Sequence, residues 1–118
     1  MDKFIIGIAL VGVIGLLGWA IFSKNQSNNQ GIILYYGNTC PHCEDLEKFI
    51  KANDIESKVS FERKEVFLSK SNSSEMGQKA AKCGLQTDVI GVPFMWTGST
   101  CLLGNDQIEK FLLAEKAK

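Results

Sequence analysis

The pattern of apolar and polar positions divides the chain into two parts. Residues 4–22 form an uninterrupted apolar run without a charged residue. As a helix this run would span about 28 Å, close to the hydrocarbon thickness of a bilayer. It predicts one N-terminal transmembrane anchor between a short tail, residues 1–3, and a flexible polar linker, residues 23–30. The alternatives are a cleaved signal peptide, for which residues 18–20 offer small residues before a cut, and a buried helix.

Residues 31–118 contain short segments with the periods of strands and helices, which predict one folded domain. Residues 32–36 (IILYY) predict a strand buried on both faces. Pro41 suits the first turn of a helix that ends at Asn53 and Asp54, with Leu46, Phe49 and Ile50 on its inner face. The other expected elements are a strand region at 58–68, a helix with Asn72 as N-cap and Glu75 at its third position that stops at Gly84, strands at 92–96 and 100–103, and a helix that starts at Asn105 or Asp106.

The resulting order is β-α-β-α-β-β-α, which predicts an α/β fold. A strand, a helix and a second strand imply a right-handed parallel crossover, and the later hairpin adds antiparallel pairing. Within the region 58–68, the charged centre at 62–65 predicts an edge strand or a bend rather than a central strand.

Composition and charge exclude several classes of protein. The chain has 118 residues, of which 45% are hydrophobic and 22% charged, which is ordinary for a globular protein. Lys plus Arg equals Asp plus Glu at 13 each, so the chain lacks the basic surface of a nucleic-acid-binding protein. The charge rule does not orient the apolar run, because Lys3 and Lys24 nearly balance across it.

The segment Cys40-Pro41-His42-Cys43 is a CxxC motif where a buried strand is followed by a helix. A sulfur at a helix N-terminus is stabilised as a thiolate, and a second sulfur three residues later can close a disulfide with it. A protonated His42 would add positive charge beside the Cys40 thiolate. A zinc site is the alternative, but it needs a second close pair, and Cys83 and Cys101 are 18 positions apart. We therefore expect redox chemistry and no metal.

Residues 35–43 (YYGNTCPHC) and 91–94 (GVPF) together resemble the thioredoxin superfamily, nearest to its glutaredoxin-like members by size, with the Pro-His dipeptide of DsbA-like proteins. The resemblance covers residues 31–118. It implies a thioredoxin-like fold with a mixed four-stranded sheet. It also implies a cis Pro93 packed against the disulfide, and Val92 as the position that contacts an extended substrate.

Three positions depart from the pattern of these families. Leu34 lies where thioredoxins and DsbA-like proteins carry a buried acid, so the usual carboxylate proton acceptor is missing. Asn38 and Gly91 replace the basic residue and the threonine typical of glutaredoxins, which leaves glutathione weakly supported as a cofactor. Glu47, one turn after Cys43, belongs to a solvated helix face or tunes the proton of Cys43.

These observations predict a membrane-tethered thiol–disulfide oxidoreductase in which Cys40 and Cys43 form the redox-active disulfide. It would need no organic cofactor, and its partners would be protein thiols or disulfides and a membrane redox protein. The apolar segment near the start of the chain, the polar linker and the Pro-His disulfide favour a domain on the extracytoplasmic side, periplasmic or at the cell surface. The alternatives are a cytoplasm-facing glutaredoxin-like reductase and a membrane-anchored metallochaperone that uses Cys40, Cys43 and His42. Cys83 and Cys101 are expected to be small buried residues, with a second disulfide as the alternative.

Overall fold

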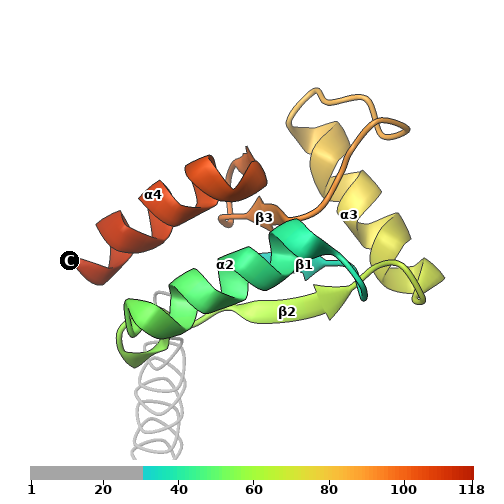
Figure 1. The fold of residues 1–118 in the computed structure, drawn as a ribbon. Coiled ribbons are helices and arrows are strands. Elements are labelled where there is room, and N and C mark those ends of the chain that lie inside the picture. The colour runs from blue at the N-terminus through green and yellow to red at the C-terminus, as the bar shows by residue number, and fades with distance from the viewer. Residues whose placement is uncertain (1–30) are drawn as a thin grey trace, which may run out of the picture. The chain divides into compact units, whose positions relative to one another are not determined.

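The computed structural model describes residues 31–118 (Figure 1). The predicted tail, apolar anchor and linker lie outside the described residues and stay predictions. Between Gly31 and Lys118, no helix is both long enough and apolar enough to cross a bilayer. The described elements are β1 (Ile33–Tyr36), α2 (Pro41–Ala52), the 3-10 helix η1 (Ile55–Ser57), β2 (Glu62–Glu65), α3 (Lys70–Lys82), β3 (Phe94–Trp96), β4 (Cys101–Leu103) and α4 (Gly104–Lys116).

The four strands form one mixed sheet in the order β2-β1-β3-β4. β1 is parallel to β2, as expected for strands joined through the crossover helix α2. β3 is antiparallel to β1, with Leu34 opposite Met95, and it is antiparallel to β4, with Trp96 opposite Cys101. The α/β class and the order of the elements are thus confirmed.

Both faces of the sheet are covered by helices. Neighbouring residues in β1 and β3 point to opposite faces, so each strand contributes side chains to two core clusters. Leu34 and Met95 lie in one core cluster with residues of α2 and α4, while Tyr35 and Phe94 lie in a second cluster with residues of α3. Figure 1 shows α2 and α4 together and α3 apart from them. This arrangement explains why residues 32–36 are continuously apolar, and it places the start of α2 at the end of β1.

The second strand differs from the expectation in its extent. It is confined to the charged centre, Glu62–Glu65, and leaves out the apolar residues on either side. β2 lies at the edge of the sheet, where hydrogen bonds from Glu62 N to Ile32 O and from Val66 N to Tyr36 O align it with β1. An edge strand tolerates charged side chains, because it is less enclosed than a central strand. In β2, Arg63 pairs with Glu47 of α2, and Lys64 pairs with Glu75 of α3.

The predicted cap of α3 is wrong. Ser69 is the N-cap, and its hydroxyl accepts a hydrogen bond from Asn72 N at 3.2 Å. Asn72 lies inside the helix and donates its side-chain amide to Glu65 O, while Glu75 pairs with Lys64 at 2.7 Å. The earlier start is possible because serine is as good an N-cap as asparagine. The predicted end is confirmed, since Gly84 follows with a φ of 73°.

Helix α4 begins slightly earlier than expected, at Gly104 instead of Asn105 or Asp106. Its buried residues are Ile108 and Leu112, which are four positions apart and lie on one face of the helix, and Phe111 is partly buried against the same core cluster. The start of this helix contacts the first turn of α2, where the Asn105 side-chain amide donates a hydrogen bond to His42 O at 3.0 Å.

Candidate functional site

Cys40 is the N-cap residue of α2 and lies directly after the turn that follows β1. Its Sγ accepts a hydrogen bond from Cys43 N at 3.2 Å, so one of the unpaired amides of the first helical turn points at this sulfur. Pro41 occupies the first turn, where a missing N–H costs nothing. The side-chain sulfur of Cys40 therefore caps the N-terminus of α2.

The two cysteines of the motif are joined in a disulfide, with their Cα atoms 5.2 Å apart. Cys40 is 7% exposed and Cys43 5%, so the pair lies just beneath the surface. Between them Pro41 and His42 are exposed. The motif expected to carry redox chemistry thus forms the bond that this chemistry makes and breaks.

The segment before β3 lies next to the reactive pair. The Val92–Pro93 peptide bond is cis, in agreement with what the family resemblance implies. Pro93 is buried and Val92 partly buried, and the Val92 carbonyl oxygen lies 3.7 Å from Cys40 Sγ. Two segments about fifty positions apart in sequence are therefore brought together around one sulfur.

The turn before Cys40 is held by Glu65, a residue that the sequence analysis did not single out. Its carboxylate accepts hydrogen bonds from Asn38 N at 2.7 Å, Phe67 N at 2.9 Å and Leu68 N at 2.7 Å. The Phe67 ring lies so close to Gly37 that a side chain there would overlap it. The Phe67 and Leu68 amides are near Glu65 in sequence, but only the pairing of β1 with β2 brings Asn38 to it, so the sequence alone does not reveal that contact.

These contacts predict how acid affects the domain. Partial withdrawal from water raises the pKa of Glu65, but hydrogen bonds from backbone amides lower it more, so the net pKa lies below its usual range. A carboxylate of this kind stabilises the fold above its unfolded pKa of about 4.3, and the contribution disappears as the pH falls further. We expect Glu65→Gln to lower the urea midpoint at pH 7, and we expect this deficit to shrink as the pH falls through the lowered pKa of Glu65. A deficit that stays the same size as the pH is lowered would contradict this, and Glu62→Gln in the same strand is the control.

A cavity of about 270 Å³ lies behind the disulfide, next to Cys43 and Pro93. Arg63 and Glu47 are paired in its wall, with Nε to Oε1 at 2.8 Å and Nη2 to Oε2 at 3.1 Å. Arg63 also pairs with Glu56, and the hydrogen bond that Arg63 donates to Glu47 is the main reason why the pKa of Arg63 is raised. The full lining is Leu34, Tyr36, Cys43, Leu46, Glu47, Arg63 and Pro93.

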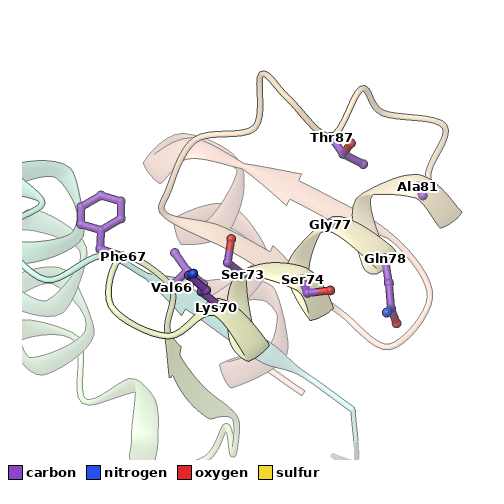
Figure 2. Close-up of a pocket in the computed structure, with 9 residues that line it drawn as sticks. All are labelled: Val66, Phe67, Lys70, Ser73, Ser74, Gly77, Gln78, Ala81 and Thr87. Carbon is purple, nitrogen blue, oxygen red and sulfur yellow. The ribbon is translucent and has the colours of Figure 1, made fainter.

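A larger, open hollow of about 670 Å³ runs along the outer side of α3 (Figure 2). Its lining contains neither cysteine of the motif. Figure 2 shows the Phe67 ring set apart from Ser73, Ser74 and Gln78, which lie along α3. We therefore place the candidate chemistry at the smaller cavity, because Cys43 of the CxxC disulfide lines it.

Cys83 and Cys101 are joined in a second disulfide, with Cα atoms 6.2 Å apart. The expectation of two separate buried residues is therefore wrong, and the alternative of a disulfide is confirmed. The bond links the C-cap of α3 to β4, because the hairpin returns Cys101 to a position opposite Trp96. Sequence spacing could not reveal this, since it does not give the distance between α3 and the hairpin.

No group of three His, Cys, Asp or Glu side chains gathers into a possible metal site within residues 31–118. No family model and no curated protein matches this chain. What the residues themselves define is a mixed α/β domain with a CxxC disulfide at the start of its first helix, an arrangement compatible with a thioredoxin-like fold.

Proposed function

We propose that this chain is a membrane-tethered thiol–disulfide oxidoreductase of the thioredoxin superfamily. The observation that carries the proposal is the position of Cys40 Sγ, which accepts the Cys43 amide at the start of α2 and lies 3.7 Å from the Val92 carbonyl oxygen. Such a position favours the thiolate form, which is the nucleophile in disulfide exchange. Cys40 is therefore the residue that attacks, or is attacked by, the partner.

The remaining site residues have separate roles in this proposal. Cys43 resolves the mixed disulfide, because it is the cysteine that forms the disulfide with Cys40. Pro93 shapes the groove beside the pair, and Val92 contacts the substrate backbone. Pro41 starts the helix, and His42 tunes the potential. The electrons travel on the sulfur atoms, so the reaction requires no organic cofactor.

The partners proposed for this protein are cysteines of other proteins and a membrane redox protein that regenerates Cys40 and Cys43. Glutathione has weaker support, because Asn38 and Gly91 do not supply the groups typical of a glutathione site. We place the domain on the extracytoplasmic side of the membrane, tethered through residues 4–22. Cys83–Cys101 supports this placement, because disulfides distant from a reactive pair persist in oxidising compartments. Labelling of Cys40 by an impermeant maleimide in intact, reduced cells separates this topology from a cytoplasmic one.

The proposed activity is tested by transfer of the disulfide itself. The oxidised full chain, purified in detergent, is mixed with a reduced, unfolded protein that contains two cysteines, and the thiols of both are counted by mass. We expect loss of the Cys40–Cys43 disulfide as the substrate gains one. Absence of transfer together with one metal ion bound per reduced chain would instead support a metallochaperone.

We also expect His42 to set the direction of exchange. The exposed ring, when protonated, stabilises the nearby Cys40 thiolate and thus the reduced protein, which makes the disulfide more oxidising. In His42→Ala the Cys40 pKa should rise and the reduction potential should fall, by about 30 mV for each unit of pKa. Equilibration with a glutathione buffer measures this change. An unchanged reduction potential would show that His42 does not tune the Cys40–Cys43 disulfide. Lys48→Ala on the same helix is the control.

A further inference from the structure

The cavity behind the disulfide lies beside the sulfur that has to lose a proton. Cys43 is 5% exposed, so its thiol has little direct contact with bulk water. The cavity borders Cys43 on one side, and on the other it reaches Glu47, whose side chain is 35% exposed. It therefore connects the buried sulfur to a carboxylate in contact with solvent.

The carboxylate is well positioned for a proton transfer. Glu47 follows Cys43 by four residues in α2, so both side chains lie on the same side of the helix. Among the residues that line the cavity, Glu47 is the only one with a carboxylate. Leu34 lines the same cavity from β1, is 1% exposed and cannot accept a proton.

We propose that Glu47 accepts the proton of Cys43 through this cavity when Cys43 resolves a mixed disulfide, and returns it in the reverse step. The inference rests on the proposed function. It assigns to α2 the proton acceptor that β1 lacks at Leu34. Glu47 is here a proton-transfer group that acts on Cys43, while the sulfur exchange itself stays with the two cysteines.

The resolving step balances as follows. The Cys43 thiol loses its proton to Glu47, and its sulfur attacks Cys40 Sγ, which is bonded to the partner's sulfur. The Cys40–Cys43 bond forms, the bond from Cys40 to the partner breaks, and the electron pair leaves on the partner as a thiolate. In this step the Cys43 sulfur is oxidised and the partner's sulfur is reduced, while the Cys40 sulfur keeps the oxidation level that it had in the mixed disulfide. Glu47 then passes its proton to solvent.

Arg63 provides a way to separate proton transfer from simple electrostatics. The charged and titratable groups around the cavity are Glu47 on α2, Arg63 on β2 and Tyr36 on β1, and Glu56 of η1 pairs with Arg63 from outside. If Glu47 only neutralised Arg63, its removal would leave a cation near Cys43, which favours the thiolate and speeds resolution. If Glu47 accepts the proton, its removal slows resolution. The two roles predict opposite signs.

The test uses the full chain in detergent, reduced at Cys40 and Cys43, and an excess of dithiobis(nitrobenzoate), an aromatic disulfide that releases a coloured thiolate. The first thiolate reports the attack by Cys40, and the second reports resolution by Cys43. In Glu47→Gln we expect the second phase to slow by about 10-fold or more at pH 6, in line with general-base catalysis. The difference should shrink towards pH 9, where hydroxide replaces the carboxylate. The first phase should not change.

Three further variants sharpen the result. Glu44→Gln, an exposed position one turn earlier on the same helix, should behave like the wild type. Glu47→Asp keeps a carboxylate and should be faster than Glu47→Gln, and equal rates would contradict the proposal. Cys40→Ser gives the background from other thiols. If the wild type shows no first phase, the proposed function fails; if both phases occur but Glu47→Gln resolves as fast as the wild type or faster, only the role of Glu47 fails.

Discussion

Replacing Cys40 by serine should abolish disulfide exchange, whereas replacing Cys43 by serine should arrest it halfway. Cys40 is the sulfur that caps α2 and accepts the Cys43 amide, so its loss removes the nucleophile. In Cys43→Ser the first exchange still occurs, but no second sulfur is available to release the partner. We therefore expect mixed disulfides to accumulate in cells that express Cys43→Ser, with almost none in Cys40→Ser.

Non-reducing electrophoresis followed by peptide mapping measures this difference. The partner cysteine should be bonded to Cys40, and the double variant Cys40→Ser/Cys43→Ser should give the background. Accumulation of complexes in Cys40→Ser but not in Cys43→Ser would reverse the two roles. Both variants should fold like the wild type, because each substitution removes one sulfur and Cys83–Cys101 is left intact.

Removal of the second disulfide should cause the largest loss of stability. Cys83 and Cys101 close a loop of 18 positions, and a cross-link of that length stabilises a fold by about 3 kcal/mol, mainly by restricting the unfolded chain. We expect the double variant Cys83→Ala/Cys101→Ala to lose about this amount in urea unfolding. For a domain of this size the melting temperature should fall by roughly 12–24 °C.

The same variant should retain exchange through Cys40 and Cys43 at temperatures where it is folded. The second disulfide joins α3 to β4 and is not part of the lining of the cavity behind the reactive pair. Loss of exchange in a folded double variant would mean that Cys83 and Cys101 take part in electron transfer. A loss of stability below about 1 kcal/mol would show that packing alone holds α3 against the hairpin.

The sequence predicts the order of the elements because their local signals agree with their tertiary surroundings. A continuous apolar run forms β1, a proline starts α2, and a glycine follows α3. The CxxC motif lies at the junction of β1 and α2, as expected from the same signals. These features depend on neighbouring residues, so one sequence is enough to find them.

The errors arise where long-range contacts decide the outcome. The expected edge position of the charged centre is confirmed, but the strand region at 58–68 is too long, because only residues 62–65 make the backbone pairing with β1. The bond between Cys83 and Cys101 depends on how α3 packs beside the hairpin. The hydrogen bond from Asn38 N to Glu65 and the pairing of Glu47 with Arg63 also join separate elements. Sequence spacing carries no signal for any of them.

The reduction potential of the Cys40–Cys43 bond tests the central claim most directly, with Cys83–Cys101 in the same chain as an internal reference. The full chain is equilibrated with glutathione and dithiol buffers, the thiols are trapped with acid and alkylated, and each cysteine pair is quantified by mass. An exchanging pair should have a potential above about −270 mV, within the range of catalytic disulfides, while Cys83–Cys101 should lie below about −300 mV, as structural disulfides do. A Cys40–Cys43 potential as low as that of Cys83–Cys101 would contradict the account and make the motif a structural cross-link.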